Sequence, residues 1–471
     1  MKKAMRLPSF RHLQCLLLLV LCTTLASCAS LPSVQTLNTS VDVDAPKTPT
    51  IETANGVLSR KQAAALLAQR LRTDQIDLPD IASLEEAATD SPLIAGNKVT
   101  LLNDGPQTIA AMIEAIKQAT DSIDLETYIF DEGMLGDEFS DLLIRKQRAG
   151  VQVNIIYDGV GCIDTPAAFF QKLRAAGISL LEFHPVNPLK RLGRGWRINN
   201  RDHRKILVVD GKVAFTGGIN ISDDYSSGSL FHSRAKSAQA QAHLGWRDTH
   251  VRVEGPAASA FQWLFMQTWV SQTGKAPPKR NYFPALKPVG QQVVRVIGSE
   301  PGGSYQTYKA YMLAIEEAKK TIHITNAYFV PDQDLVHALI RAARRGVDVK
   351  IIFPGISDTN LVRRATQSYY AELLAGGVHI YELQGSVLHA KTAVIDGYWS
   401  TVGSTNLDMR SFLHNREVNM ITLDAGFGAQ MESTFNEDLK HSVEITPEKW
   451  AQRPLIHRFG EWLARRLAYW L

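Results

Sequence analysis

The sequence predicts an α/β fold of two tandem domains of related design, each a mostly mixed β-sheet flanked by helices. Strand-like and helix-like apolar spacings alternate in the same order twice along the chain, which is typical of α/β sheets. A stretch rich in breakers, 275–290, separates the two repeats. The segments 148–151 (RAGV) and 344–347 (RRGV) take the same place in each repeat. A repeat of this length indicates a duplicated domain and not a solenoid.

The first repeat contains a helix, a strand, a helix and a strand in succession. Its apolar residues recur at helical spacing and then in continuous runs bounded by polar residues. The predicted elements are a helix over 109–116, a strand at 122–130, a helix ending at 148 and a strand at 151–156.

The second repeat has the same four elements in the same order. They are a helix at 308–319, a strand at 322–329, a helix ending at 345 and a strand at 347–352. With the flanking segments, this gives six parts. They are a signal peptide at 1–27, a tether with one helix near 60–72 at 28–92, a first domain at 93–275, a linker at 276–290, a second domain at 291–445 and a C-terminal amphipathic helix at 446–471.

The N-terminus has the composition of a secretory signal peptide. Four basic residues accompany a short apolar run at 16–21, and small residues follow it. The residues up to Cys28 resemble a bacterial lipobox, which implies cleavage before Cys28 and lipidation of its thiol; an uncleaved N-terminal anchor is the alternative. Ala29 after the cysteine favours the outer membrane by resemblance to bacterial sorting rules. We therefore expect a chain in the bacterial cell envelope, anchored at the periplasmic face of the outer membrane rather than at the inner membrane.

Cleavage changes both the charge and the cysteine count. The chain has 51 basic and 47 acidic residues, and four of the basic residues lie in the leader, so the mature chain is expected to be neutral. A neutral balance does not favour the extended basic surface of a nuclease. Cys15 and Cys22 leave with the leader and Cys28 is lipidated. Cys162 then remains as a small bystander, and no disulfide within the chain is expected.

Each half carries the same cluster of polar residues. The clusters are His203, Lys205, Asp210, Gly217 and Asn220 in the first half, and His389, Lys391, Asp396, Gly403 and Asn406 in the second. In both, the glycine follows the histidine by 14 residues and the asparagine follows it by 17. This agreement is too close to be coincidental.

The spacing of these residues indicates phosphoryl chemistry. A histidine and a lysine two positions apart on a strand project from the same face. Two such halves bring two histidines, two lysines and two asparagines into one shared active-site cleft, where cations neutralise phosphate oxygens and imidazoles provide nucleophilic attack and proton transfer. Asp210 and Asp396 complete the candidate catalytic motif. They stand at the far end of a buried strand, before a glycine, where fixing a turn or pairing with a cation is favoured over contact with substrate.

The duplicated His-x-Lys-x4-Asp pattern resembles the phospholipase D superfamily and, within it, the bacterial cardiolipin synthases. The similar stretches are 201–205, 217–220, 246–256, 328–332 and 388–419. The resemblance covers about 95–445, and the chain departs from it at the start, where typical members have transmembrane helices and this chain has a lipoprotein signal.

The resemblance implies a ping-pong phosphatidyl transfer with no metal and no other cofactor. His203 attacks the phosphorus of the donor, and His389 protonates the leaving alcohol and then deprotonates the acceptor. The same resemblance assigns phosphate-holding roles to Lys205, Lys391, Asn220 and Asn406. It implies that Glu417, which follows His389 by 28 residues, orients a histidine, with Asp248 as the first-half counterpart. No zinc or magnesium ligand spacing stands out in the sequence.

Three further segments bear on contact with lipid. The basic run in 184–205 suits anionic headgroups, although a solvated basic loop is nearly as well supported. The insertion at 222–245 is predicted to be a mobile loop, either passive or gating lipid access. Residues 454–471 place aromatic and basic residues at helical spacing, which favours an interfacial helix slightly over a helix docked on the protein.

We therefore predict a phosphatidyltransferase that makes cardiolipin from phosphatidylglycerol. The alternatives are a hydrolase that releases phosphatidic acid, a nuclease, and a non-catalytic lipoprotein that only binds lipid. Phospholipids and the membrane surface are the expected partners and nucleic acid is not. The sequence leaves open the second phospholipid and the oligomeric state.

Overall fold

The computed structural model describes residues 31, 48–71, 78–187, 197, 199–226 and 245–467. The predicted signal peptide and the lipidation site Cys28 lie outside the described residues. So do residues 188–196 and 198 of the basic run, residues 227–244 of the insertion, and the end of the chain after Leu467.

The first half is built on a mixed seven-stranded sheet. Its strands lie in the order β6 (Ser179–Phe183), β5 (Gln152–Asp158), β4 (Ser122–Thr127), β8 (Ile206–Val209), β9 (Val213–Gly217), β11 (His250–Glu254) and β3 (Leu93–Leu102). β4, β5 and β6 are parallel, whereas β4–β8 and the pairings beyond it are antiparallel. The predicted strands at 122–130 and 151–156 are central members of this sheet.

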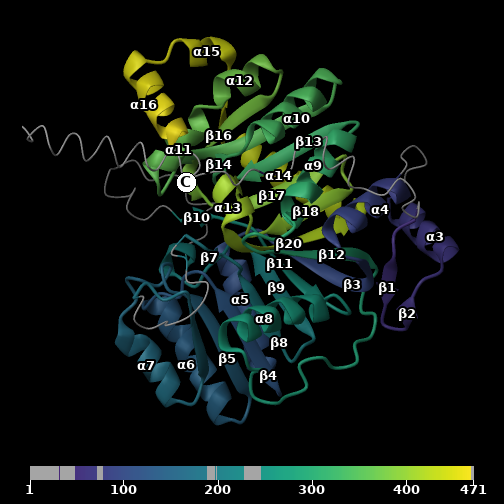
Figure 1. Ribbon diagram of the computed structural model, residues 1–471, viewed down its shortest axis with the longest axis vertical. Helices are drawn as coiled ribbons and strands as arrows, with labels where there is room; N and C mark the ends of the chain where they lie inside the picture. The colour runs from purple at the N-terminus through teal and green to yellow at the C-terminus, as the bar shows by residue number, and fades with distance from the viewer. Residues whose placement is uncertain are drawn as a thin grey trace, which may run out of the picture. The chain divides into compact units, whose positions relative to one another are not determined.

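The second half repeats this order strand for strand. The sequence is β16 (His379–Leu388), β15 (Asp348–Ile356), β13 (Thr321–Asn326), β17 (Lys391–Ile395), β18 (Trp399–Gly403), β20 (Asn415–Leu423) and β12 (Gln292–Ser299). β3 and β12 pair antiparallel, so the two sheets are continuous, and Figure 1 shows these strands where the blue-teal half meets the green-yellow half. The predicted duplicated α/β design with mixed sheets is confirmed.

Helices cover the sheets at equivalent places in the two halves. The main ones are α5 (Gly105–Gln118), α6 (Met134–Arg148), α7 (Ala167–Ala175) and α8 (Ala258–Thr273) in the first half, and α9 (Gln306–Glu317), α10 (Gln333–Arg344), α11 (Asn360–Gln367), α12 (Tyr370–Ala375) and α14 (Ala425–Lys440) in the second. The side chains of α5, α6 and α7 pack on one face of β4, β5 and β8 in an apolar core. A second core joins the other face of the first sheet to α8, α14 and strands of the second half. The sheets are therefore covered on their faces by helices or by the other half, as expected for strands made of continuous apolar runs.

Short elements complete the chain. They are β1 (Ile51–Thr53), β2 (Gly56–Val57), α3 (Arg60–Leu71), α4 (Leu78–Thr89), β7 (Arg201–Asp202), η2 (Asp223–Tyr225), β10 (Trp246–Arg247), β14 (Phe329–Val330), β19 (Leu407–Asp408), α13 (Met409–Leu413), β21 (Ser442–Ile445), α15 (Pro447–Ala451) and α16 (Leu455–Arg466). Within the described ranges, no helix is both long and apolar enough to cross a membrane.

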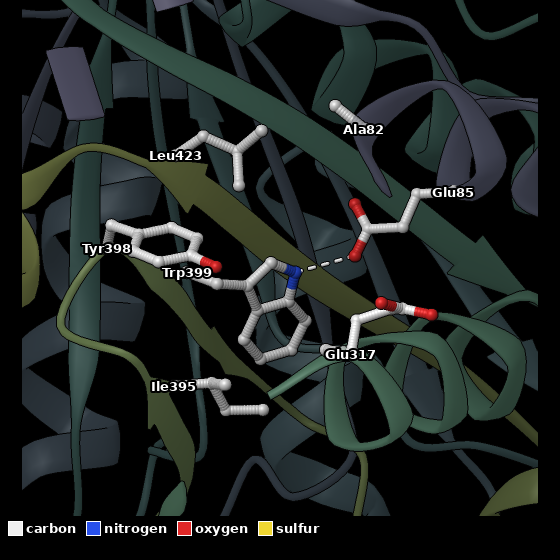
Figure 2. Close-up of a pocket in the computed structure, with 8 residues that line it drawn as sticks. Ala82, Glu85, Glu317, Ile395, Tyr398, Trp399 and Leu423 are labelled. Carbon is white, nitrogen blue, oxygen red and sulfur yellow. Dashed lines mark hydrogen bonds between the residues drawn. The ribbon is translucent and has the colours of Figure 1, made fainter. Parts of the chain in front are cut away.

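The segment before the first sheet is more ordered than a tether with one helix. β1 pairs with β3, and a second helix, α4, follows α3. Buried Glu85 of α4 accepts a hydrogen bond from Arg295 of β12 at 2.8 Å. It accepts another from the indole of Trp399 at 2.6 Å, drawn as a dashed line in Figure 2. The polar composition of this segment does not predict its attachment. A buried ion pair to the second half and the buried apolar side chains Ala63, Leu67 and Leu71 of α3 hold it together.

Two basic residues beside His203, Arg201 and Arg204, do not lie on a surface for anionic headgroups, which is one interpretation of the basic run. The guanidinium of Arg201 pairs with Asp158 at 3.0 Å, and both side chains are buried. Arg204 is fully buried and donates to the backbone oxygen of Glu417 at 3.1 Å and to Thr268 Oγ1 at 3.1 Å. These two arginines therefore hold the catalytic segment in place and do not form a surface for anionic lipid.

Candidate active site

The two motif histidines lie where a strand of one half meets a strand of the other. β7 pairs parallel with β20, and the amide of His203 donates to the backbone oxygen of Arg416 at 2.9 Å. The end of β16 pairs parallel with β10, and the amide of His389 donates to the backbone oxygen of Arg247 at 2.8 Å. β7 and β10 lie between the two halves in Figure 1. Each histidine is thus held by the opposite half.

Each imidazole also meets a carboxylate from the opposite half. Nδ1 of His203 lies 3.0 Å from both carboxylate oxygens of Glu417. Nδ1 of His389 lies 2.8 Å from Oδ2 of Asp248. The sequence indicated both acids without indicating which histidine each faces, and the structure shows that the pairs are crossed. An Nδ1 proton shared with a carboxylate leaves Nε2 of each ring available for chemistry.

The motif lysines lie beside the histidines. Lys205 Nζ donates to the backbone oxygen of His203 at 2.7 Å, and Lys391 makes the same bond to His389. Their ammonium groups lie 5.3 Å and 5.8 Å from the ring centres of Tyr128 and Tyr328, respectively. Both lysines are buried, and burial lowers the pKa of Lys205 to about 7 and that of Lys391 to about 8. The carboxylates of Glu417 and Asp248 oppose this lowering for both lysines.

Burial also lowers the pKa of both histidines. For His203 the positive charges of Lys205 and Lys391 add to the effect, and the pKa falls well below its ordinary value. For His389 the charge of Lys391 adds to burial, whereas Asp248 opposes the shift. His203 is therefore neutral at physiological pH, which is the form that a nucleophile requires.

Glu417 has a network of its own in the second half. Burial raises its pKa to about 7, against the opposing effect of Lys205. The hydroxyl of Ser404 donates to one of its oxygens, and Asn415 Nδ2 donates to the other at 3.2 Å. These bonds fix the carboxylate that orients His203.

Different contacts position the carboxylate of Asp248. Ser404 and Gly218 follow the motif histidines at the same distance, yet Gly218 has no side chain to donate. A Cβ at Gly218 would lie 2.2 Å from Asp248 Oδ1, so glycine is needed for the aspartate to reach His389. The amide of Thr249 donates to Oδ1 at 2.7 Å. The two carboxylate–histidine pairs are therefore related in position but differ in their surroundings.

Tyr225 is a site residue that the sequence did not reveal. Its hydroxyl lies 3.1 Å from Nδ1 of His389, and its ring packs against Trp246, whose own ring is 5.0 Å from that of His389. It lies in the 222–245 insertion, where no periodicity marks a functional residue. Tyr128 and Tyr328 were missed as well, although a tyrosine after the first central strand of each half is a repeated signal.

The two motif asparagines are buried beside this cluster. Oδ1 of Asn220 accepts from the amide of Ile129 at 3.2 Å, and its Nδ2 donates to the hydroxyl of Tyr225 at 3.3 Å. Oδ1 of Asn406 is buried with no hydrogen-bond partner in the part of the chain that the structure describes. The protein contacts of Asn220 make it a support for Tyr225, and phosphate binding by either amide stays a prediction.

The motif aspartates lie away from the histidines, which corrects their inclusion among the catalytic residues. Asp210 follows β8 and accepts hydrogen bonds from the amides of residues 120, 121 and 122. Asp396 does the same for the amides of 319, 320 and 321. Burial opposes the shift, yet these bonds hold the pKa of Asp210 below its ordinary value. A strand of this length separates each aspartate from its histidine by about 20 Å.

The Asp-Gly pairs form the tight turns that the sequence predicts. Asp210 and Gly211 have φ of 52° and 63°, and Asp396 and Gly397 have φ of 51° and 72°. Two successive left-handed residues are the geometry of the hairpin turn that Asp-Gly favours. The aspartates thus join each hairpin to the start of β4 or β13, which keeps the strand that leads back to the site in register.

Two other expectations concern cysteine and metal. Cys162 is buried, its sulfur accepts from the amide of Phe130 at 3.2 Å, and burial raises its pKa. Among the described residues, no group of three or more His, Cys, Asp or Glu side chains is arranged to hold a metal ion.

Comparison with known families and proteins agrees with this arrangement. The family described as "Cardiolipin synthase, PLD-like domain" matches residues 112–229 and 311–439, which contain the two motifs. A cardiolipin synthase of Alkalihalophilus pseudofirmus is 37% identical over 382 residues, covering 80% of this chain and 73% of that protein. Cardiolipin synthases of Listeria monocytogenes (37% identity, 80% and 76%) and Geobacillus kaustophilus (35% identity, 80% and 73%) are similar over comparable spans.

Solved structures share the fold at low sequence identity. The phosphatidylserine synthase of Haemophilus influenzae superposes with a TM-score of 0.58 at 15% identity, over 79% of this chain and 95% of that one. A polyphosphate kinase of Porphyromonas gingivalis gives a TM-score of 0.50 at 11% identity, over 84% of this chain and 56% of that one. At these identities the likeness concerns the fold alone.

Proposed function

The chain belongs to the cardiolipin synthase family of phospholipase D-like proteins, and we propose that it moves a phosphatidyl group through a phosphohistidine on His203. It is a phosphatidyltransferase of the cardiolipin synthase type that acts on phospholipids. The observation that carries the proposed mechanism is the pair of buried histidine–carboxylate contacts, each with a lysine beside it. Phosphatidylglycerol is the proposed donor, and its glycerol hydroxyl is the proposed acceptor group.

The first step forms a covalent intermediate. Nε2 of neutral His203 attacks the phosphorus of phosphatidylglycerol, and the bond from phosphorus to the glycerol oxygen breaks. Glycerol leaves with a proton from Nε2 of His389. The negative charge of the bound phosphodiester raises the pKa of His389 enough for the ring to hold that proton. Lys205 and Lys391 neutralise the phosphate oxygens.

The second step returns the enzyme to its starting state. Nε2 of His389 takes the proton of the acceptor hydroxyl on a second phosphatidylglycerol. The hydroxyl oxygen then attacks phosphorus, the phosphorus–nitrogen bond to His203 breaks, and cardiolipin leaves. Glu417 and Asp248 stabilise whichever imidazole gains positive charge.

Product analysis tests the transfer. The full chain is given labelled phosphatidylglycerol in vesicles, and the products are identified by mass spectrometry. We expect cardiolipin and free glycerol in equal amounts, and no product from His203→Ala. Phosphatidic acid as the single product would instead establish a hydrolase.

A donor with an activated leaving group tests which histidine attacks. p-Nitrophenolate leaves from phosphatidyl-p-nitrophenol without needing a proton, so formation of the intermediate no longer depends on the acid. We expect His389→Gln to release about one equivalent of p-nitrophenol per chain in a burst and His203→Gln to release none. The opposite pattern would assign the attack to His389.

We also propose that the chain acts at a membrane of the bacterial envelope, lipid-anchored through Cys28. The sequence before Cys28 supports this placement, and the outer membrane is favoured by Ala29. Labelled palmitate should enter the wild-type chain and not Cys28→Ser, and the label should fractionate with the outer membrane. Label in both chains would contradict the anchor, and label in the inner membrane would contradict the sorting.

A further inference from the structure

α16 carries a large exposed apolar face. Of the fifteen exposed large apolar side chains in the described part of the chain, six lie on α16 or at its C-cap. They are Leu455, Ile456, Phe459, Trp462, Leu463 and Leu467, with Leu455 77% exposed and Phe459 61% exposed. Their spacing places them on one face of the helix. Isolated exposed apolar residues are ordinary, whereas a contiguous set of this kind marks an interaction surface.

The opposite face of α16 is fixed to the protein, so the apolar face is held outward. Glu461 is buried and binds Arg453 through both carboxylate oxygens at 2.9 Å and 3.1 Å. Ala464 is buried, and Arg465 lies over the ring of Tyr369 at 4.5 Å and contacts Glu372 at 3.4 Å. The sequence left two alternatives for this helix, docking on the protein or lying in a membrane interface. In the structure one face is docked and the opposite face is free for an interface.

The charges around the apolar face are positive. Arg458 and Arg466 are exposed, and Arg466 lies over the ring of Trp462 at 5.2 Å. The one acidic residue of α16, Glu461, is neutralised in the docked face. An aromatic, arginine-bearing face without a free carboxylate matches an anionic lipid surface.

The helix that carries the apolar face packs on an element next to the active site. α16 packs on α11, and Figure 1 shows it beside that helix. Asp358, just before α11, accepts a hydrogen bond from the hydroxyl of Tyr328, and the Tyr328 ring is 6.2 Å from that of His389. Leu361 of α11 is exposed as well. Insertion of the outward face of α16 into a membrane would therefore hold the active site close to the lipid headgroups.

We propose that the outward face of α16 inserts into the headgroup region of an anionic phospholipid bilayer and orients the site toward its substrates. The helix has 12 residues and a length of about 18 Å, so it lies along the surface and does not cross. The inference rests on the proposed function only in that phospholipid substrates bring the chain to a bilayer. Binding is therefore tested in a chain that cannot turn over.

The experiment measures co-flotation of the full chain, carrying His203→Ala and Cys28→Ser, with vesicles of phosphatidylcholine alone or mixed with phosphatidylglycerol. We expect the triple variant Leu455→Ser, Phe459→Ser, Trp462→Ser to bind mixed vesicles about 100-fold more weakly. The matched control is Trp263→Ser on α8, which removes a tryptophan that is 61% exposed, and binding should not change. Arg458→Gln with Arg466→Gln should remove the preference for phosphatidylglycerol.

Equal binding by the triple variant and its parent would overturn the proposal. A parent that is dimeric in solution, with a monomeric triple variant and unchanged flotation, would assign the face to a second copy of the chain and overturn it as well. Turnover of monomeric short-chain phosphatidylglycerol by the triple variant with His203 and Cys28 intact shows that the variant is folded. If product analysis refuted cardiolipin synthesis, the flotation result would still decide this inference.

Discussion

At the residue scale, the two motif histidines differ in what faces Nδ1. Among the described residues, Nδ1 of His203 contacts Glu417 alone, whereas Nδ1 of His389 contacts both Asp248 and the hydroxyl of Tyr225. Asn220 donates to that hydroxyl and so ties Tyr225 to the first-half motif. We interpret Tyr225 as a positioning residue for His389, the proposed proton donor.

Tyr225→Phe keeps the ring against Trp246 and removes the hydroxyl. Because one hydrogen bond of about 1 kcal/mol is lost, we expect kcat for cardiolipin formation to fall about fivefold with little change in KM. The p-nitrophenol burst, which needs no proton from His389, should keep its rate. A burst that slowed as much as overall turnover would show that the effect is a general disturbance of the site.

The pH dependence follows from the buried lysines. With burial lowering the pKa of Lys205 to about 7 and that of Lys391 to about 8, both lose charge as pH rises through this range. We therefore expect kcat/KM, measured from pH 5 to 10, to fall above about pH 7 to 8. Bound phosphate raises the same pKa values, so the fall in kcat should lie at higher pH. A kcat/KM that stayed flat to pH 9.5 would contradict this role for the lysines.

At the element scale, polar contacts hold segments that apolar packing alone does not place. Asp396 and Asp210 each bind three amides at the start of a central strand, and Glu85 ties α4 to β12 and β18. The contacts of Glu85 are buried and therefore costly to break, because the partner groups remain without water.

Asp396→Ala separates a structural role from a catalytic one. Three amides lose their acceptor, so we expect the free energy of unfolding to fall by about 1–3 kcal/mol in urea titrations. The kcat of the folded variant should match that of the wild type. A loss of kcat of about 100-fold with unchanged stability would return the aspartate to the catalytic set.

Glu85→Ala leaves the Arg295 guanidinium buried without its partner. We expect the free energy of unfolding to fall by about 3–5 kcal/mol, measured by circular dichroism in urea. Glu317→Ala is the matched control, since Glu317 lines the same pocket in Figure 2 but its side chain is 43% exposed. The control should change stability by less than about 0.5 kcal/mol. Equal effects of the two variants would refute the role given to the ion pair.

At the scale of the whole molecule, the two halves complete one another. Glu417 of the second half orients the histidine of the first, and Asp248 of the first half orients that of the second. The parallel pairings β7–β20 and β10–β16 impose this exchange. A half by itself therefore contains no complete histidine–carboxylate pair.

The crossed arrangement makes a specific kinetic prediction. With phosphatidyl-p-nitrophenol, Glu417→Gln should slow the burst by about 10- to 1000-fold, because the proposed nucleophile His203 loses its orienting acid. Asp248→Asn should leave the burst near its wild-type rate and slow transfer to the acceptor. Stopped-flow absorbance measures the burst, and cardiolipin formation measures the transfer. The reverse pattern would show that each acid serves the histidine of its own half.

The sequence by itself determined the duplicated α/β design, the central strands, the Asp-Gly turns and the residue types of the site. Each of these is a local property, readable from spacing, turn chemistry or a repeated motif. Only the tertiary structure decided that Glu417 serves His203, that Tyr225 reaches His389, that Arg201 and Arg204 are buried, and that α4 is clamped to the second half. The physical reason is that these contacts join residues far apart in the chain through strand pairing and buried polar bonds. Neither the strand pairings nor the buried polar bonds leave a periodic signal in the sequence.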